Sequence, residues 1–184
     1  MASTALLEPF SIQMKKTFLL SSIITSILVI SSAYLPSVQI ANAKQKNVSI
    51  LKAKCVSSGL GSARLRKENV SIGRAVYTSK FYLGPGSRSA AITCKIRPDK
   101  SPQPVFKTLN LGFGMRDKDM TSPDVNVKIY LDGQEAETIS IAPTKPSLAK
   151  IDVSNVSNVA VEAICTNPNR YCDRVYFFTA DMER

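Results

Sequence analysis

The sequence predicts an all-β protein: a single antiparallel β-sandwich domain that follows a signal peptide. Three observations favour this fold class. Apolar residues alternate with polar ones in short runs such as Val125–Leu131, which indicates strands with one buried face. Segments rich in Gly, Pro, Asp and Ser separate these runs, as turns do. No window of about ten residues has the apolar period of an amphipathic helix.

The first 43 residues have the order of a cleavable secretory signal. Lys15 and Lys16 form a positive region, residues 17–35 are apolar and uncharged, and Ala41-Asn42-Ala43 supplies the small residues of a cleavage site. Met14 is the expected start, because the stretch before it lacks these features. An uncleaved membrane anchor is the alternative, since the apolar run approaches the length of a spanning helix.

Cleavage after residue 43 would deliver a secreted or periplasmic chain that is not stably inserted in a membrane. We divide this chain into an N-terminal strand and loop, 44–68, and a β-sandwich, 69–184. It has 22 basic and 13 acidic side chains, a net charge of +9. Such a charge favours polyanionic ligands or serves solubility. Export argues against nucleic acid as the partner.

The expected strands follow in chain order. Val48 and Ile50 begin a strand, residues 59–67 form a loop, and the aromatic-rich run 77–83 is one strand. Asp132-Gly133 lies between two alternating runs and predicts a tight hairpin, because Gly accepts a positive φ. The remaining alternating runs are 92–96, 105–113, 125–131, 139–141, 149–153, 159–165 and 175–179.

All four cysteines follow the signal region, and an even number in an exported chain predicts two disulfides with three possible pairings. Cys165 and Cys172 flank a six-residue loop between what we interpret as adjacent strands, so we expect them to pair. Cys55 and Cys94 would form the second bridge. The spacing does not suit zinc and no His is present, so we predict no metal.

The absence of His also excludes Ser-His-Asp and Cys-His nucleophiles, and we predict neither catalysis nor a cofactor. The absence of Trp removes the indole as a platform for a sugar ring. Five Tyr and five Phe follow the signal region and remain available for stacking.

Residues from Ser71 to the C-terminus resemble the NPCBM domain, a carbohydrate-binding module found beside bacterial glycoside hydrolases. The likeness is carried by Gly73-Arg74-Ala75-Val76-Tyr77, Val105-Phe106-Lys107-Thr108-Leu109, Gly114-Met115-Arg116-Asp117, residues 127–133, Ile151-Asp152-Val153-Ser154 and residues 173–181. The resemblance implies a jelly-roll, galactose-binding-like sandwich and a sugar ligand. Two positions depart from the family: Gly84-Pro85 replaces a His-Ala pair, and Phe177 stands where Trp is frequent.

The best ligand-binding candidates are Arg170, Tyr171, Asp173 and Arg174, which lie in a connection between strands. Arg and Tyr side chains can stack on a sugar ring, and a carboxylate accepts hydrogen bonds from paired hydroxyls. The alternative is a disulfide-closed loop with solvated charges.

A second polar loop contains Asp117, Asp119 and Asp124, whose carboxylates could hold Ca²⁺. Arg116 and Lys118 interleave with them and the spacing is not that of an EF-hand, so ordinary turn residues are the favoured interpretation. A carboxylate pair could also hydrolyse glycosides, but the sequence shows no sign of a cleft.

The sequence therefore predicts an exported, non-catalytic carbohydrate-binding module. Its expected ligand is a glycan or polysaccharide, bound weakly and with a preference for acidic groups. The alternative is a structural or adhesive module on the same scaffold whose partner is an envelope protein.

Overall fold

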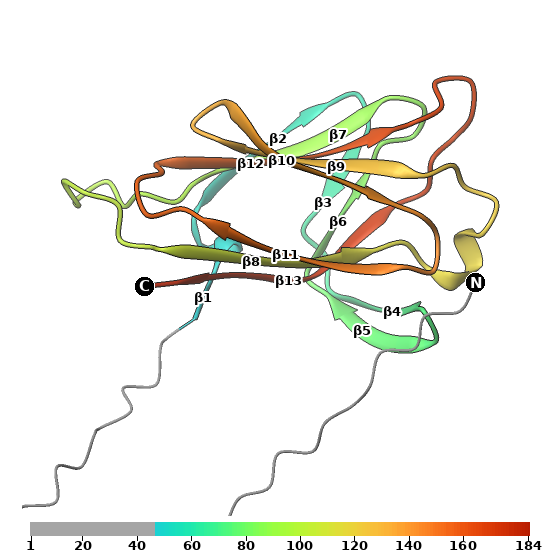
Figure 1. Cartoon of the computed structure of the whole chain (residues 1–184), viewed down its shortest axis with the longest axis horizontal. Coiled ribbons are helices and arrows are strands. Elements are labelled where there is room, and N and C mark those ends of the chain that lie inside the picture. The colour runs from blue at the N-terminus through green and yellow to red at the C-terminus, as the bar shows by residue number, and fades with distance from the viewer. Residues whose placement is uncertain (1–46) are drawn as a thin grey trace, which may run out of the picture. The chain divides into compact units, whose positions relative to one another are not determined.

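The computed structural model describes residues 47–184, which form two facing antiparallel sheets (Figure 1). The strands are β1 (Val48–Ser49), β2 (Lys54–Gly59), β3 (Ser62–Arg64), β4 (Glu68–Ile72), β5 (Ala75–Ser79), β6 (Phe81–Gly84), β7 (Ser89–Lys95), β8 (Thr108–Gly114), β9 (Val125–Leu131), β10 (Gln134–Ile141), β11 (Pro146–Asp152), β12 (Asn158–Cys165) and β13 (Val175–Glu183). The helical elements of this segment are two short 3-10 turns, η1 (Ile50–Lys52) and η2 (Asp117–Asp119). No helix within residues 47–184 is long and apolar enough to cross a membrane. The predicted signal peptide lies outside the described residues.

The first sheet has the strand order β11-β8-β13-β6-β3, and β1 pairs with the end of β13. The second sheet has the order β10-β9-β12-β7-β2. The chain passes repeatedly from one sheet to the other, so β12 and β13 lie in opposite sheets although they are consecutive. This arrangement confirms the predicted fold class, an antiparallel β-sandwich.

The core forms where the inner faces of the two sheets meet. On β9 the alternating residues Val125, Val127 and Ile129 are fully buried, as their spacing predicts. The register places Ala163 of β12 opposite Val127, so neighbouring strands bury the same face. A shift of one residue would expose this apolar row, and the core therefore fixes the register.

The turn between β9 and β10 has the predicted tight geometry. Asp132 and Gly133 have φ angles of 47° and 87°, both in the left-handed region that a type I′ turn requires. The Asp132 carboxylate also accepts hydrogen bonds from the backbone N–H groups of Ser157 and Asn158. The turn is thus tied to the start of β12.

Strands β4 and β5 form a separate hairpin over the outer face of the first sheet (Figure 1). Beneath it lies a small apolar cluster that contains Val70, Ile72, Tyr82 and Tyr176. The outward-facing aromatics of β6 and β13 are consequently buried as well as the inward-facing ones. The alternating pattern in the sequence indicated the strands β6 and β13, but it did not indicate that the β4–β5 hairpin covers their outer face.

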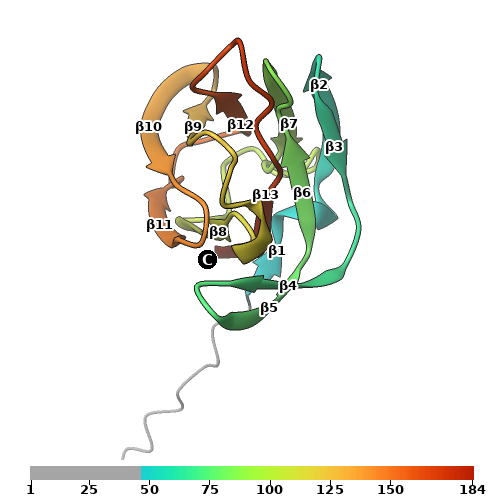
Figure 2. The same ribbon diagram turned by 90° about the vertical axis from the view of Figure 1, so that its right-hand side faces the viewer.

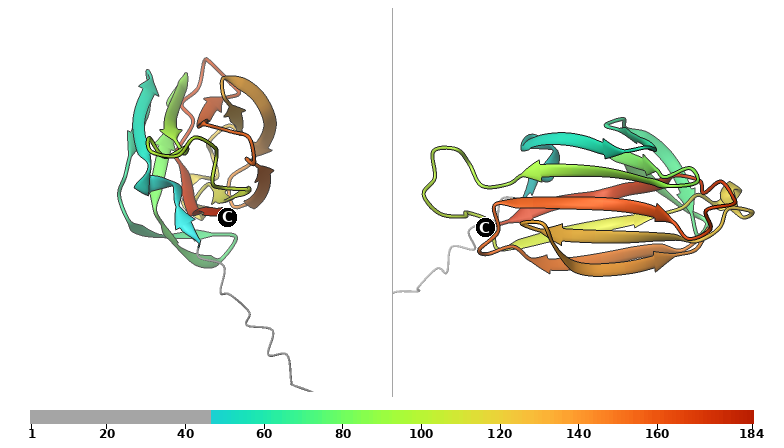
Figure 3. Two further views of the ribbon diagram at one scale, coloured as in Figure 1. Left: turned by 90° about the vertical axis from the view of Figure 1, so that its left-hand side faces the viewer. Right: turned by 90° about the horizontal axis from the view of Figure 1, so that it is seen from above.

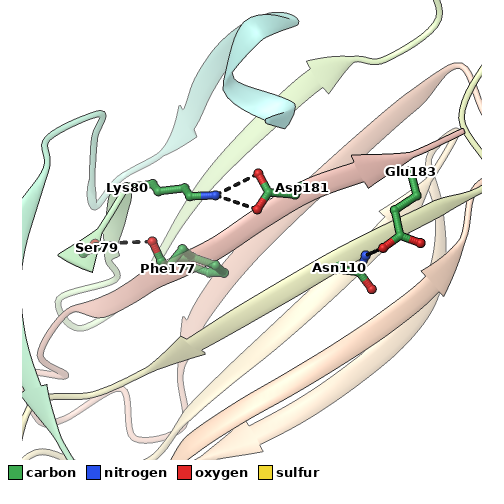
Figure 4. Close-up of polar contacts among 6 residues, drawn as sticks. All are labelled: Ser79, Lys80, Asn110, Phe177, Asp181 and Glu183. Carbon is green, nitrogen blue, oxygen red and sulfur yellow. Dashed lines mark hydrogen bonds and ion pairs between the residues drawn. The ribbon is translucent and has the colours of Figure 1, made fainter. Parts of the chain in front are cut away.

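The predicted strand 77–83 is two strands that meet at Lys80. Ser79 is buried, and its hydroxyl donates to the Phe81 carbonyl at 2.7 Å and to the Phe177 carbonyl at 3.4 Å. The Lys80 ammonium contacts both carboxylate oxygens of Asp181 on β13, and Figure 4 shows this ion pair beside the Ser79–Phe177 hydrogen bond. The break lets β5 leave the first sheet and form the covering hairpin while β6 stays in it. The prediction of one strand was wrong. The aromatic residues of β5 and β6 both face buried surfaces, so the sequence shows one continuous aromatic run although the strands belong to different sheets.

The N-terminal region 48–64 contributes strands to both sheets. β3 lies inside the predicted loop 59–67, and β2 forms an edge of the second sheet. In the run 105–113, the strand begins only at Thr108, because Val105 and Phe106 belong to the long connection after β7.

Both predicted disulfides are confirmed. Cys55 on β2 lies directly opposite Cys94 on β7, and their bond joins neighbouring strands. Cys165 is bonded to Cys172, but the assumption that this pair closes a hairpin was wrong. The bridge spans the connection from β12 to β13, which crosses between the two sheets.

Candidate functional site

Three connections converge at one end of the sandwich, which we call the loop end (Figure 2). They are the β6–β7 connection, 85–88, the β8–β9 connection, 115–124, and the β12–β13 connection, 166–174. The Cys172 N–H donates to the Gly86 carbonyl at 2.8 Å, and the Asp173 N–H donates to the Ser122 hydroxyl at 2.9 Å. The third connection is therefore held by both of the others.

The disulfide gives this end a covalent closure. Cys172 is fully buried and Cys165 nearly so, and the Cys165 N–H donates to the Arg88 carbonyl at 2.9 Å. Residues between the two cysteines are thus restrained at both ends. Such restraint holds side chains in place on an otherwise irregular loop. The loop therefore loses less conformational entropy when a ligand binds.

Tyr171 is an exposed aromatic side chain of the loop end, with 68% of its surface exposed. Its ring lies beside Gly86, where an added Cβ would come within 3.6 Å of the Tyr171 Cε2 atom. Gly86 has a φ of 63° and adopts this conformation without the steric cost of a side chain. Tyr171 borders a hollow of about 440 Å³ whose other walls are residues 60–62 and 84–88.

Arg174 lies beside the same Gly-Pro-Gly segment, at Gly84. Its guanidinium carbon is 4.5 Å from the centre of the Tyr82 ring, a cation–π distance. A Cβ added at Gly84 would meet the Arg174 Cγ atom at 3.3 Å. Tyr171 and Arg174 therefore lie beside two glycines of one short segment, Gly86 and Gly84.

The other two predicted residues face the β8–β9 connection. Arg170 donates from Nη2 to the Thr121 carbonyl, so its guanidinium braces the loop. Asp173 is half-buried, and this burial, followed by the charge of Asp119, raises the pKa of its carboxyl group. The structure thus places the four candidates at one end of the sandwich but divides them into two pairs.

The acidic residues of the β8–β9 connection have partners within the protein. The Asp117 carboxylate accepts hydrogen bonds from the Ser71 hydroxyl and from the N–H groups of Gly73 and Arg74, at the turn between β4 and β5. Asp119 is buried and forms two hydrogen bonds with the Arg116 guanidinium, at 3.0 and 3.1 Å. Among residues 47–184, no three His, Cys, Asp or Glu side chains are arranged to hold a metal ion.

Phe177 occupies the position where NPCBM sequences frequently have Trp, and it lies in the core. It is fully buried and stacks on Phe81, with ring centres 4.4 Å apart and planes 4° from parallel. Phe177 is therefore a core residue, and this position offers no exposed platform for a sugar ring.

Several residues of the loop end were not singled out from the sequence. Leu60, Gly61 and Arg88 line the hollow beside Tyr171, and Arg116 lies 4.9 Å from the centre of the buried Tyr176 ring. Leu60 and Arg88 are far apart in the chain, and no periodicity relates them. The pairings of β2 with β7 and of β3 with β6, together with the hydrogen bond from the Gly61 N–H to the Ser89 carbonyl, bring their segments together.

The sandwich is similar to known carbohydrate-binding modules. No protein-family model and no curated protein matches the chain. The CBM51-2 and INT domains of Clostridium perfringens ZmpB, solved in complex with GlcNAc, match with a TM-score of 0.59 and 15% identity. This match covers 76% of the present chain and 32% of the ZmpB chain, so it spans about a third of that structure.

A CBM51 from a Clostridium perfringens GH95 protein, solved in complex with methyl-galactose, matches with a TM-score of 0.57 and 9% identity. Here the alignment covers 74% of this chain and 99% of the other. The match therefore includes an entire module of that class. At these identities the likeness is one of fold: the chain shares the β-sandwich fold of these carbohydrate-binding modules.

Proposed function

We propose that this protein is an exported, non-catalytic carbohydrate-binding module that binds glycans at the loop end. The observation that carries the proposal is Tyr171, an exposed aromatic ring held by a disulfide-closed loop beside an open hollow. Aromatic rings at such sites stack on the apolar faces of sugars. The fold supports the same function, because two matching modules were solved with GlcNAc and with methyl-galactose.

The charges around Tyr171 support a preference for acidic glycans. Arg88 lines the hollow, and Arg174 lies beside Gly84, which also lines it. The net charge of +9 on residues 44–184 adds long-range attraction for a polyanion, a contribution that salt screens. A single exposed ring and a few arginines provide little buried contact area, so binding should be weak.

Export is the second part of the proposal. It rests on the signal-like sequence of the first 43 residues and on two disulfides, which are typical of oxidising compartments. The proposed location is secreted or periplasmic. Glycans of a cell envelope or of an extracellular matrix would be accessible there. We also propose that the chain belongs to the NPCBM family, and an extracellular location is compatible with that assignment.

The second candidate function is binding to an envelope protein. The observation that favours it is Leu60, which has 76% of its surface exposed and borders the same hollow as Tyr171. An exposed Leu beside an exposed Tyr suits the apolar centre of a protein interface better than it suits a sugar.

A salt titration of two variants tests the glycan proposal. Binding of the purified exported protein to neutral galactan and to polygalacturonate would be measured over a range of salt concentrations. Tyr171→Ala should lose binding at every salt concentration, because stacking is not screened. Arg174→Gln, which keeps the stem of the side chain, should lose roughly two- to fivefold in affinity for polygalacturonate at low salt and little at high salt.

Lys145→Gln is the matched control, since it removes one exposed charge from the β10–β11 connection, away from the hollow. It should change binding much less than Arg174→Gln. If wild type binds neither glycan at millimolar concentration, the proposal fails and a protein partner becomes the leading function. If Tyr171→Ala binds as wild type does, the glycan site lies elsewhere.

A further inference from the structure

A second pocket lies at the end of the sandwich opposite the loop end, and its volume is about 220 Å³. It opens beside the long connection after β7, which projects from that end in the view from above (Figure 3, right). Its walls come from β1, η1 and β2 on one side, and from the end of β7, the residues after it and β13 on the other. The pocket therefore lies between the two sheets, where the N-terminal strands join the sandwich.

The floor of this pocket is apolar. The side chains of Ile96, Phe106 and Met182 form it, and all three belong to the hydrophobic core. Val48 and Ala53 complete the apolar lining and are half-buried. An open pocket with such a floor favours a ligand that places apolar surface against it.

The rim is strongly basic. Lys52, Lys54, Lys95 and Arg97 line the pocket together with one acidic residue, Asp99. These five side chains carry a net charge of +3. The Arg184 guanidinium carbon lies 5.8 Å from the centre of the Phe106 ring.

Asp99 forms ion pairs with two of these lysines. Its carboxylate oxygens lie 2.6 Å from the Lys54 ammonium and 2.6 Å from the Lys95 ammonium. One carboxylate therefore balances only half of their charge. Within the described part of the chain, neither Lys52 nor Arg97 forms a direct ion pair with an acidic side chain, although the positive charge of Arg97 acts on the Asp132 carboxylate. The rim thus carries a net positive charge.

We propose that this pocket is a binding site for a small amphiphilic carboxylate. The apolar body of the ligand would lie against Phe106 and Met182, and its carboxylate would lie at the rim between Lys52 and Arg97. The volume is below the roughly 300–1,000 Å³ of pockets for drug-sized ligands, so a compact ligand with one ring or a short chain fits best. The site is independent of the proposed glycan site, because the two lie at opposite ends of the sandwich.

Hydrocinnamate is a suitable probe, since it combines one apolar ring with one carboxylate. It would be titrated into isotope-labelled exported protein while backbone amide shifts are recorded by NMR. We expect saturable shifts at Ile96, Arg97 and Phe106. Hydrocinnamyl alcohol, which lacks the charge, and acetate, which lacks the ring, should each bind more weakly by roughly fivefold or more.

Two substitutions at the rim should change affinity in opposite directions. Arg97→Gln removes a cation and should weaken hydrocinnamate binding by roughly two- to fivefold. Asp99→Asn releases Lys54 and Lys95 from their shared carboxylate and should strengthen binding by a similar factor. General damage to the fold would not produce a gain. Lys145→Gln, at the other end of the molecule, is the matched control and should have no effect.

A third substitution, Ala53→Leu, fills the pocket without changing its charge and should abolish the shifts at Phe106. The proposal is overturned if no saturable shift occurs at millimolar hydrocinnamate, or if the shifts gather around Tyr171. It is also overturned if the alcohol binds as tightly as the acid, or if Asp99→Asn does not strengthen binding.

Discussion

At the scale of single residues, Asp117 shows how an ordinary turn residue can organise the surface next to a candidate site. Its carboxylate accepts three hydrogen bonds from the turn of the β4–β5 hairpin. These bonds, led by the one from the Ser71 hydroxyl, lower the pKa of Asp117. The charged form is the one that ties the hairpin to the β8–β9 connection.

This contact predicts a pH-dependent loss of stability for Asp117→Asn. The folded-state pKa lies below the unfolded value, so the stabilisation is present above about pH 4 and is lost as the pH falls through the lowered pKa. Asp117→Asn should therefore lower the urea midpoint at neutral pH, and its difference from wild type should shrink in acid. Unfolding followed by circular dichroism measures both.

Asp124→Asn provides the control for this prediction, because Asp124 is an exposed residue of the same connection and contributes its backbone carbonyl, not its carboxylate, to hydrogen bonds. It should leave the midpoint nearly unchanged at every pH. An Asp117→Asn variant that differs from wild type equally at neutral and acid pH would show that the carboxylate charge is not responsible.

At the scale of elements, the β4–β5 hairpin buries part of the outer face of the first sheet, where that face carries aromatic residues. Tyr77 of the hairpin stacks on Phe178 of β13 with ring centres 4.2 Å apart, and Ile72 is fully buried. A sheet with one face in water would show a polar residue at every second position. β13 instead reads Val175-Tyr176-Phe177-Phe178, since the hairpin covers its outer face.

The hairpin predicts a large difference between two aliphatic substitutions. Ile72→Ala should destabilise the protein by about 2–5 kcal/mol, because it removes buried methyl groups and leaves a cavity over Tyr176. Val76→Ala, on the exposed face of β5, should change stability by less than about 0.5 kcal/mol. Urea denaturation of both variants measures the difference. Equal effects would mean that the hairpin does not pack on the sheet in solution.

At the scale of the whole molecule, the sandwich presents different chemistry at its two ends. The loop end offers an exposed ring and a disulfide-closed loop, and the opposite end offers an apolar floor with a basic rim. The two disulfides follow this division, because Cys165–Cys172 closes the loop end while Cys55–Cys94 fastens β2 to β7. A substitution at one end therefore does not directly contact residues at the other end.

The mature protein should begin at Lys44. This prediction rests on Ala41-Asn42-Ala43, which follows a charged and then apolar leader. N-terminal sequencing of the exported protein measures the start directly. A start upstream of Thr17, found in the membrane fraction, would show that the apolar run is retained as an anchor.

Period-two patterns and turn chemistry predicted much of the fold correctly, because both are local. Val125–Leu131 and the Asp132-Gly133 turn have the predicted strand and hairpin structure. The four cysteines were paired correctly from their spacing, although the geometry assumed for Cys165 and Cys172 was not the true one. Short-range signals of this kind survive because the backbone conformations they require do not depend on distant partners.

The sequence by itself therefore determined the all-β class, the strands of the C-terminal half with their inward faces, and the β9–β10 turn. Only the tertiary structure decided which sheet each strand joins, that the run 77–83 divides at Lys80, and that Tyr171 and Arg174 flank Gly84 and Gly86. It also decided that Phe177 is a core residue and that a basic pocket lies at the opposite end. The physical reason is that an alternating pattern records that a face is buried but not what buries it, and in a sandwich the covering partner comes from distant parts of the chain.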